Sequence, residues 1–350
     1  MAYESDLALR LVPYTAGEQP KDRKFIKLNT NENPYPPSPR VEKAVAGLAE
    51  SLRLYPDMEA TALRETIAQV NGVAPEMVFC GNGSDEVLAF AFAAFFAGKR
   101  LLTPDVTYSF YPVYANLFGV AHETVPLKED FTVDVDGMLQ GCPMALANPN
   151  APTGIELPQE EIRRMANHAK ENGAVLLVDE AYAAFATETA VPLLKEFDNL
   201  LIVRTFSKSH ALAGMRVGYA MGSKQLIDAL RRIRDSFNSY PLDRYAQAAA
   251  TVSMLDVDYT ARSTALVVAA RDKAYAALKA NGIDVLKSAT NFLFVKAGED
   301  AAPVQKALRD EGILVRHFSA PRLKSWLRVT IGTTEDMETV TEALIRLIKG

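Results

Sequence analysis

Short apolar runs alternate with amphipathic stretches between about residue 77 and residue 240. Each run is four to six residues long and rich in Val, Leu, Ile and Ala, which is typical of buried strands. The predicted strands are Met77–Cys80, Arg100–Thr103, Ala121–Val125, Pro143–Ala147, Ala174–Val178, Leu200–Thr205 and Val217–Met221. Strands that alternate with helices favour an α/β fold with a mostly parallel sheet, here of seven strands.

The helices predicted between these strands have recognisable ends. The helix Met58–Val70 follows Asp57, which we expect to be its N-cap, and stops before Gly72. The helix Pro158–Asn172 has proline near its start and glycine just after its end, and its apolar residues recur at helical spacing. One face of this helix should therefore pack on the sheet.

The pattern changes after Tyr240 to long Ala-rich helices followed by short, separated strands, which predicts a small α+β domain. Its expected elements are Asp243–Leu255, Tyr259–Ala280, Asn291–Val295, Ala302–Glu311, Ile313–Arg316, Leu327–Ile331 and Glu335–Ile348. Asn and Pro are crowded near the N-terminus and indicate an extended arm. We expect an arm over residues 1–35, a large domain over 36–240 and a small domain over 241–350.

Composition narrows the function classes. Hydrophobic residues make up 49% and charged residues 23% of the 350 positions, so a folded soluble protein is expected. The net charge of -5 disfavours nucleic acid and anionic membranes as partners. Two cysteines are too few for a disulfide framework or a thiolate metal site, so we expect no metal and a cytoplasmic location. The acidic N-terminus is unlike a signal peptide, and the longest apolar run is too short to span a bilayer.

A glycine-rich turn follows the first predicted strand. The segment from Gly81 to Glu86 opens a helix, and a helix N-terminus with free N–H groups can bind a phosphate, with Ser84 as a further contact. On its own, the simpler reading of Ser84 as an N-cap is favoured. The segment is not a dinucleotide fingerprint, because Glu86 stands where a third glycine is required.

Two more candidate groups follow buried strands. Asp179 ends the apolar run Ala174–Val178, at the edge of the sheet where ligands bind, and it would need a cationic partner; a surface aspartate is the equal alternative. Lys208 follows the next strand and could form a Schiff base, with Arg216 as a cation for phosphate. Taken singly, a surface lysine is the commoner explanation. We interpret His210 as a packing residue.

Together these groups describe one ligand. A phosphate cradle, a lysine for an aldehyde and a carboxylate for a protonated ring nitrogen match pyridoxal 5′-phosphate. Asp179 would keep the pyridine nitrogen protonated, so that the ring accepts the electrons of a carbanion at the substrate carbon. Lys208, once displaced by the substrate amine, would move the proton between substrate and cofactor carbons.

The order and spacing of these motifs resemble the fold-type I, class II aminotransferases, and within them the histidinol-phosphate branch. The resemblance covers nearly the whole chain. Its motifs are Asn31-Glu32-Asn33-Pro34-Tyr35, Tyr55-Pro56-Asp57, Gly83-Ser84-Asp85-Glu86, Asn150-Ala151-Pro152-Thr153-Gly154, Asp179-Glu180-Ala181-Tyr182, Ser207-Lys208 with Arg216, and Leu327-Arg328-Val329-Thr330-Ile331-Gly332-Thr333.

The resemblance implies the fold of aspartate aminotransferase and a role for each matching residue. Lys208 would be the Schiff-base lysine, Asp179 the partner of the pyridinium and Tyr182 a hydrogen-bond donor to the phenolic oxygen. Tyr108 would stack on the cofactor ring, and Tyr55 would reach the cofactor phosphate of a neighbouring subunit, which implies a homodimer. The groups implied to hold the phosphate within the subunit are Ser84, the backbone of Asp85, Ser207 and Arg216.

The chain departs from the family pattern at one position. Many members have asparagine directly before Pro-Thr-Gly to bind the phenolic oxygen, whereas this chain has Ala151 there. We expect Asn150 to reach that oxygen; the alternative is that Tyr182 binds it alone. The sequence leaves the Ala151–Pro152 bond open between cis and trans.

The resemblance also implies a reaction, namely amino-group exchange between histidinol phosphate and 2-oxoglutarate in histidine biosynthesis. Arg328 resembles the arginine that binds the substrate carboxylate in aminotransferases, and here it would bind the phosphate of histidinol phosphate together with Arg316. Glutamate would use the same cation. Tyr14, Asn29 and Tyr35 in the arm would cover the substrate, with packing of the arm as an equal alternative.

Other functions remain open from the sequence. An aromatic-amino-acid aminotransferase or a threonine-phosphate decarboxylase of the same branch would use the same features, since pocket shape decides specificity. A cofactor-binding sensor domain of a transcription regulator is improbable, because only about thirty loop-like residues precede the first motif and leave no room for a DNA-binding module. A nicotinamide dehydrogenase is weaker still, because the glycine fingerprint is absent.

Overall fold

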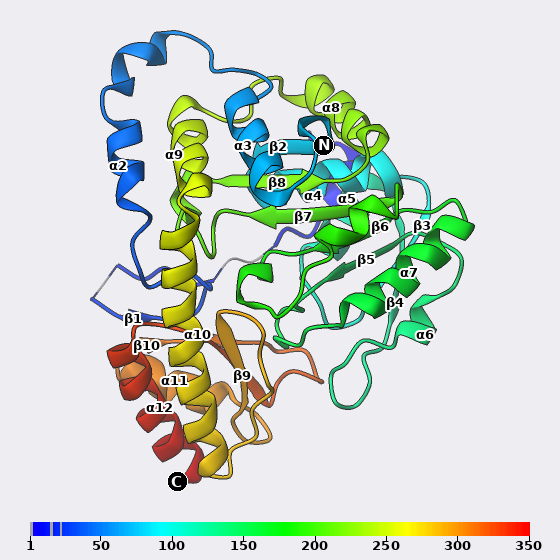
Figure 1. The fold of residues 1–350 in the computed structure, drawn as a ribbon. Helices are drawn as coiled ribbons and strands as arrows, with labels where there is room; N and C mark the ends of the chain where they lie inside the picture. The colour runs from blue at the N-terminus through cyan, green and yellow to red at the C-terminus, as the bar shows by residue number, and fades with distance from the viewer. Residues whose placement is uncertain (1–2, 15–16, 22) are drawn as a thin grey trace.

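The computed structural model describes residues 3–14, 17–21 and 23–350, and its largest element is a seven-stranded sheet (Figure 1). The strand order is β2-β8-β7-β6-β5-β3-β4; β8 runs antiparallel to both of its neighbours and the other pairs are parallel. The strands are β2 Val78–Asn82, β3 Arg100–Pro104, β4 Ala121–Val125, β5 Met144–Ala147, β6 Leu176–Asp179, β7 Leu200–Thr205 and β8 Val217–Met221. The prediction of a mostly parallel, seven-stranded α/β sheet is confirmed.

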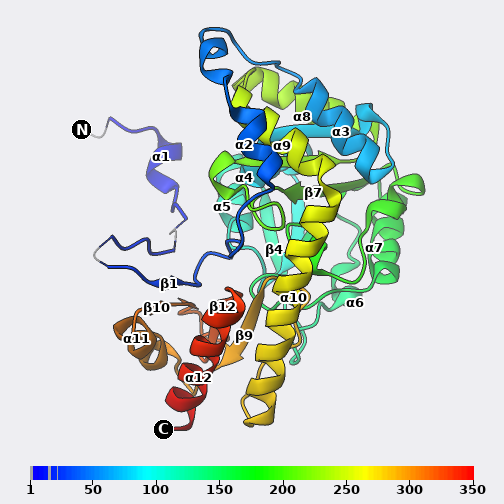
Figure 2. The ribbon, with the colours of Figure 1, turned by 60° about the vertical axis from the view of Figure 1, so that its left-hand side comes forward.

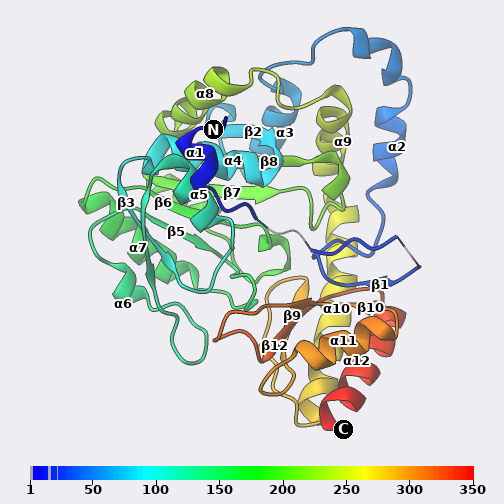
Figure 3. The same cartoon turned by 180° about the vertical axis from the view of Figure 1, so that it is seen from behind.

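Helices cover both faces of this sheet (Figures 1 and 3). One face packs against α3 Thr61–Asn71, α7 Gln159–Glu171 and α9 Arg244–Leu255. The other face packs against α4 Gly83–Ala91, α5 Tyr111–Phe118 and α8 Lys224–Phe237. Shorter helices are α1 Asp6–Arg10, α2 Pro39–Val45 and α6 Val135–Met138.

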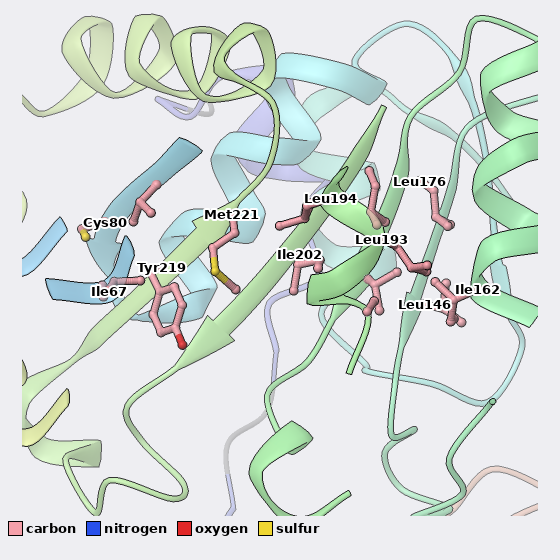
Figure 4. Close-up of a cluster of buried hydrophobic side chains, with 14 of the residues drawn as sticks. Ile67, Cys80, Leu146, Ile162, Leu176, Leu193, Leu194, Ile202, Tyr219 and Met221 are labelled. Atoms are coloured by element: carbon pink, nitrogen blue, oxygen red, sulfur yellow. The ribbon is translucent and has the colours of Figure 1, made fainter. Parts of the chain in front are cut away.

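The apolar run of β6 shows why both faces need cover. Leu176 and Val178 belong to the core shared with α7, whereas Leu177 between them belongs to the core shared with α4 and α5. Successive residues of a strand point to opposite faces, so a continuous apolar run is stable only between two helical layers. Figure 4 shows the first of these cores, where side chains of neighbouring strands, such as Leu176 and Ile202, meet those of the covering helices, such as Ile162.

A small domain lies beyond the long helix α10 Val257–Ala280, which runs from the large domain into it (Figures 1 and 2). Its antiparallel sheet has the order β11-β12-β9, and a second, parallel pair joins β1 to β10. The elements are β1 Ile26–Lys27, β9 Phe292–Lys296, α11 Ala302–Asp310, β10 Ile313–Leu314, β11 Arg316–His317, β12 Trp326–Thr330 and α12 Thr334–Lys349.

The structure differs from the predicted domain division at both ends of the large domain. Helix α9 follows the expected boundary at residue 240, yet its buried residues belong to the large-domain core with α3. Part of the expected arm pairs with the small domain through β1, and Leu28 is buried in the small-domain core. The division therefore follows packing partners that composition does not reveal.

Two local predictions also need correction. The Asp57 carboxylate accepts hydrogen bonds from the N–H groups of Glu59 and Thr61, but the helix begins only at Thr61, so Asp57 caps the preceding turn rather than a helix from Met58. The single strand expected over 313–316 is two strands, β10 and β11, which lie in different sheets. Within the described ranges, no helix is both long and apolar enough to cross a membrane.

Candidate active site

A cavity of about 440 Å³ opens where β6 and β7 end, beside the first turn of α4 and the chain segment at residues 30–32. The carboxyl ends of parallel strands form the usual binding crevice of such sheets. Eight residues predicted from the sequence line it, namely Ser84, Asp85, Tyr108, Asp179, Tyr182, Ser207, Lys208 and Arg216. The fold thus brings together groups that lie up to 132 positions apart in the chain.

Lys208 stands in the loop after β7, and its Nζ donates a hydrogen bond to the carbonyl oxygen of Thr30 at 3.4 Å. The pKa of this amine is lowered to about 8, chiefly by loss of hydration and also by the Arg328 cation, while Glu32 and Asp85 oppose the shift. A larger fraction of the amine is therefore neutral near pH 8 than for an exposed lysine, as a nucleophile requires.

Asp179 ends β6 and is buried at 5% exposure. Its carboxylate accepts hydrogen bonds from the N–H of Ala181 at 3.1 Å and the hydroxyl of Tyr111 at 3.5 Å. Burial raises the pKa of this carboxyl to about 7, because two neutral donors do not replace the lost hydration of a charge. A cationic group placed beside it would restore the anion.

The first turn of α4 is held close to β8. A Cβ atom added at Gly218 would lie 2.2 Å from the backbone nitrogen of Ser84, so only glycine permits this approach. Gly83, at φ 81°, likewise makes room for Arg216, whose Nη2 would lie 2.6 Å from a Cβ there. The approach keeps the N–H groups at the start of α4 beside a guanidinium, which is an anion-binding arrangement.

Asp85 holds the groups around this turn. Its carboxylate pairs with Nη2 of Arg216 at 2.8 Å and accepts a hydrogen bond from the hydroxyl of Tyr108 at 2.8 Å. Arg216 itself has φ 50°, a left-handed conformation that is uncommon outside glycine. Asp85 therefore holds in place both the arginine and the tyrosine, which line the cavity.

Tyr182 is buried, and its hydroxyl accepts a hydrogen bond from Nδ2 of Asn31 at 2.8 Å. The Nζ of Lys208 lies 5.9 Å from the centre of its ring. Burial raises the pKa of the phenol, so it stays protonated and can donate.

Asn150 does not join the residues around Lys208. Its Nδ2 donates to the carbonyl oxygen of Val106 at 2.9 Å and to the hydroxyl of Thr153 at 3.0 Å, and the side chain lines a different cavity. Ala151 lines the cavity of Lys208 in its place. The bond between Ala151 and Pro152 is cis.

Two arginines lie side by side in the small domain. Arg328 of β12 and Arg316 of β11 are direct partners in the antiparallel register. Arg328 donates through Nη2 to the carbonyl oxygen of Asn29 at 3.1 Å, and its buried Nε has no hydrogen-bond partner within the described ranges. Burial and the nearby Arg316 lower the pKa of Arg328. Both effects would be offset by an anion bound beside the guanidinium.

The other arm residues have mixed positions. The Tyr14 ring stacks on Phe110 at 4.4 Å, and Asn29 is buried and donates to the carbonyl oxygen of Glu18. Tyr35 packs against the small-domain core and does not line the cavity of Lys208, so for this residue packing is the role observed.

Tyr55 is also outside that cavity. Its side chain is 78% exposed and stacks on Tyr240 at 4.7 Å. His210 is half-buried, its Nδ1 lies 3.0 Å from the hydroxyl of Ser253, and loss of hydration lowers its pKa to about 4. In the part of the chain that the structure describes, no cluster of three metal-ligating side chains occurs.

Several site residues escaped the sequence reasoning. Thr30, Asn31 and Asn33 come from the expected arm, and Asn33 donates to the carbonyl oxygen of Lys208 at 3.0 Å. The high number of asparagines in this segment could have indicated that it is part of the site, because the backbone of a buried loop needs short polar side chains as hydrogen-bond partners. No local signal marked Tyr111 or Gly218.

The residues present fit pyridoxal 5′-phosphate. The cavity offers an amine for the aldehyde, a buried carboxylate for the ring nitrogen, a phenol for the ring oxygen, and a helix N-terminus with an arginine for the phosphate. The raised pKa of Asp179 is the observation that most directly favours a cationic ligand such as a protonated ring nitrogen.

Comparison with known proteins gives consistent matches. The family described as "Aminotransferase class I and II" matches residues 23–344. A histidinol-phosphate aminotransferase of Gluconacetobacter diazotrophicus is 48% identical, covering 97% of this chain and 96% of the relative. Histidinol-phosphate aminotransferase 1 of Bradyrhizobium diazoefficiens is 50% identical, covering 98% and 99%.

Solved structures agree with the fold. The histidinol-phosphate aminotransferase of Sinorhizobium meliloti, solved in complex with pyridoxal-5′-phosphate, has a TM-score of 0.89 at 28% identity, covering 100% of this chain and 98% of that one. An aspartate aminotransferase of Thermotoga maritima has a TM-score of 0.83 at 24% identity, covering 94% and 93%, and supports the fold alone.

Proposed function

Because the chain belongs to the class I and II aminotransferase family, we propose that it transfers an amino group between L-histidinol phosphate and 2-oxoglutarate with pyridoxal 5′-phosphate. The observation that carries this function is Lys208, an amine of lowered pKa, in one cavity with the buried Asp179 and beside Arg328. Transamination needs these three elements, namely a lysine that moves a proton, a carboxylate for the ring and a cation for the substrate.

The proposed cofactor roles follow from the positions in the cavity. When bound, the cofactor supplies an aldehyde for the amine and a ring that accepts the electrons left after removal of the substrate Cα proton. Asp179 holds a proton on the ring nitrogen, and Lys208 takes and returns the proton at the substrate carbon. Arg216, Ser207 and the first-turn N–H groups at Ser84 and Asp85 bind the phosphate.

The two arginines support a substrate with more negative charge than a single carboxylate. A phosphate monoester carries close to two negative charges at neutral pH, and adjacent guanidinium groups suit it. Arg328 and Arg316 are paired across β11 and β12, where a phosphate can meet both. Glutamate would then use Arg328 through its carboxylate, while Tyr14 and Asn29 border the same region.

A homodimer completes the proposal. Tyr55 belongs to a set of exposed large apolar side chains that also includes Leu52, Leu54, Met58, Phe237 and Tyr240. Large apolar side chains that are exposed favour a surface covered by a partner, and a second copy of the chain would cover them. Tyr55 would then reach the cofactor phosphate of the neighbouring subunit. Two free cysteines are compatible with a cytoplasmic location for this enzyme.

The test is a spectrophotometric titration of the purified holoenzyme with histidinol phosphate, threonine phosphate and aromatic amino acids. Histidinol phosphate should convert the visible band of the lysine-bound cofactor to the amine form at the lowest concentration, and 2-oxoglutarate should restore the band. A lower half-saturation for another amine would refute the substrate but keep the cofactor chemistry. The absence of any band in protein supplied with the cofactor would refute the whole proposal.

A further inference from the structure

The hydroxyl of Tyr182 receives a hydrogen bond from a residue that no family motif assigned to the cofactor. We propose that Asn31 positions this hydroxyl, so that Tyr182 donates its proton to the phenolic oxygen of the bound cofactor. The inference rests on the proposed function, and it explains how the chain binds that oxygen with alanine at position 151. Asn31 is thus a positioning residue that acts through Tyr182.

Asn31 is held rigidly in place. It is buried at 2% exposure and has φ 57°, in the left-handed region that asparagine tolerates better than most residues. Its backbone N–H donates to the hydroxyl of Thr330 at 3.0 Å, and its carbonyl oxygen accepts from Nδ2 of Asn291 at 3.0 Å. Both partners belong to the small domain, so the amide cannot turn away without breaking buried hydrogen bonds.

The orientation of the Asn31 amide follows from its second contact with Thr330. The Thr330 hydroxyl donates to Oδ1 of Asn31 at 3.0 Å, which leaves Nδ2 facing Tyr182. The opposite orientation would place two donors of Asn31 against one hydroxyl oxygen. It would also leave the Thr330 hydroxyl proton without an acceptor within the described ranges, at a buried position where that is costly.

This orientation determines what Tyr182 can do. A phenol carries a single proton, and an oxygen that accepts from Nδ2 keeps that proton for another acceptor. The Tyr182 hydroxyl has no other hydrogen bond within the described ranges. Donation from Asn31 also lowers the pKa of the phenol against the effect of burial, which makes Tyr182 a stronger donor.

Neither Ala151 nor Asn150, the described residues nearest the position where the family has asparagine, takes over the role. Ala151 lines the cavity and has no polar side-chain atom, and both amide hydrogens of Asn150 are engaged by Val106 and Thr153. Tyr182 is therefore the donor on which the phenolic oxygen depends, and Asn31 is the group that directs it.

The consequence is measurable as the pKa of the Schiff base between Lys208 and the cofactor. The phenolic oxygen is shared between the imine proton and the Tyr182 hydroxyl, so stronger donation from Tyr182 weakens the hold on the imine proton and lowers this pKa. Loss of Asn31 should therefore raise it. A single neutral hydrogen bond corresponds to a shift of about half to one pH unit.

The experiment titrates the visible band of the holoenzyme with pH for the unchanged protein, Asn31→Gly, Tyr182→Phe and the double variant. Glycine accepts the positive φ, so Asn31→Gly removes the amide without straining the backbone. We expect Asn31→Gly and Tyr182→Phe each to raise the pKa, and Asn31→Gly to add no further shift when Tyr182 is already Phe. This dependence on Tyr182 is the readout that a merely structural role would not produce.

Asn31→Asp provides a second, nearly isosteric variant. It keeps the acceptor for Thr330 but offers a carboxylate oxygen to the Tyr182 hydroxyl, so it should take the proton away from the cofactor and raise the pKa at least as much as Tyr182→Phe. An unchanged pKa in Asn31→Gly and Asn31→Asp overturns the inference while the proposed function stands. An equal shift from Asn31→Gly with and without the Tyr182 hydroxyl also overturns it. The absence of a visible band in the unchanged protein overturns the inference together with the proposed function.

Discussion

Replacing Gly218 with alanine should remove most of the affinity for pyridoxal 5′-phosphate, although Gly218 offers no side chain to the ligand. Gly218 lies in β8, directly behind the first turn of α4. The added Cβ would lie 2.2 Å from the nitrogen of Ser84, 2.4 Å from the carbonyl carbon of Gly83 and 2.7 Å from the Cα of Ser84. All three atoms are backbone, so the clash cannot be relieved by a change of rotamer.

The size of the effect follows from the movement required. Ordinary contact begins at 3.4 Å, so the turn must retreat by about 1.2 Å. A hydrogen bond of ordinary length from a first-turn N–H is lost after such a movement. Each bond to a charged group contributes about 1.5–3 kcal/mol, so the loss of two such bonds should weaken cofactor binding by about 100-fold or more.

The assay compares cofactor dissociation constants and thermal unfolding for the unchanged protein, Gly218→Ala and Gly214→Ala. Gly214 lines the same cavity, but an added Cβ there would meet nothing within 4 Å, which makes it a matched control. At a cofactor concentration about 100 times the original dissociation constant, binding stabilises the fold by about 2.7 kcal/mol, and a 100-fold loss of affinity reduces this to about 0.4 kcal/mol.

Overpacking should also destabilise the cofactor-free Gly218→Ala protein, by about 1–3 kcal/mol. The difference between the loaded and cofactor-free proteins separates this effect from the loss of binding. A dissociation constant for Gly218→Ala within threefold of the original would refute the reasoning that places the phosphate at the start of α4. Equal losses for Gly218→Ala and Gly214→Ala would refute the argument from backbone approach.

Four further outcomes are expected. The rate at which cofactor-free protein forms the visible band should rise with pH through about 8, because Lys208 is nucleophilic only when neutral and its pKa is lowered to about 8; a rise only near pH 10 would contradict this. Asp179→Asn should retain the cofactor but slow both half-reactions in stopped-flow measurements, and unchanged rates would exclude its role at the ring nitrogen. Arg316→Ala should raise KM for histidinol phosphate more than for glutamate, whereas equal increases in steady-state kinetics would argue against binding of the phosphate. Inactive Tyr55→Phe and Lys208→Ala subunits should regain partial activity when mixed and reassembled, and hybrids without activity would count against a shared site.

The fold was predictable because its main signals are local. All seven strands of the large sheet overlap their predicted ranges, since each is a short apolar run bounded by turn residues. Helix α7 differs from its predicted ends by one residue at each side, because Pro158 and Gly173 mark both. The prediction of one strand over 313–316 was wrong because strand pairing is not a local signal. The run of three apolar residues and one arginine does not reveal that β10 and β11 pair with different strands.

The site was predictable only as far as its residues end strands or start helices. Asp179 ends a strand of the large sheet, and Lys208 and Ser84 follow strands of the same sheet, so a common binding edge could be inferred for them. Gly218 and Asn31 owe their importance to atoms more than 130 positions away in the chain, on β2–α4 and on the loop after β6. Contacts over such separations are set by packing of the whole fold and leave no local pattern.

The segment at residues 29–33 shows how such long-range contacts determine the geometry of the site. It was expected to be an arm over the site, yet its backbone forms part of the wall. The carbonyl oxygen of Asn29 accepts a hydrogen bond from Arg328, and that of the next residue, Thr30, accepts one from the amine of Lys208. Asn31 and Asn33 then donate to Tyr182 and to the Lys208 carbonyl.

Five consecutive residues therefore connect the cation that would bind the substrate, the amine that would move its proton and the phenol that would bind the cofactor. These groups come from two domains, and neither domain alone could fix their separation. The buried parts of this segment must satisfy their own backbone as well, which explains why Asn29 and Asn31 stand there rather than apolar residues. The geometry of the site thus depends on the length of this segment, so an insertion between Asn29 and Asn33 should abolish catalysis while the core of each domain remains folded.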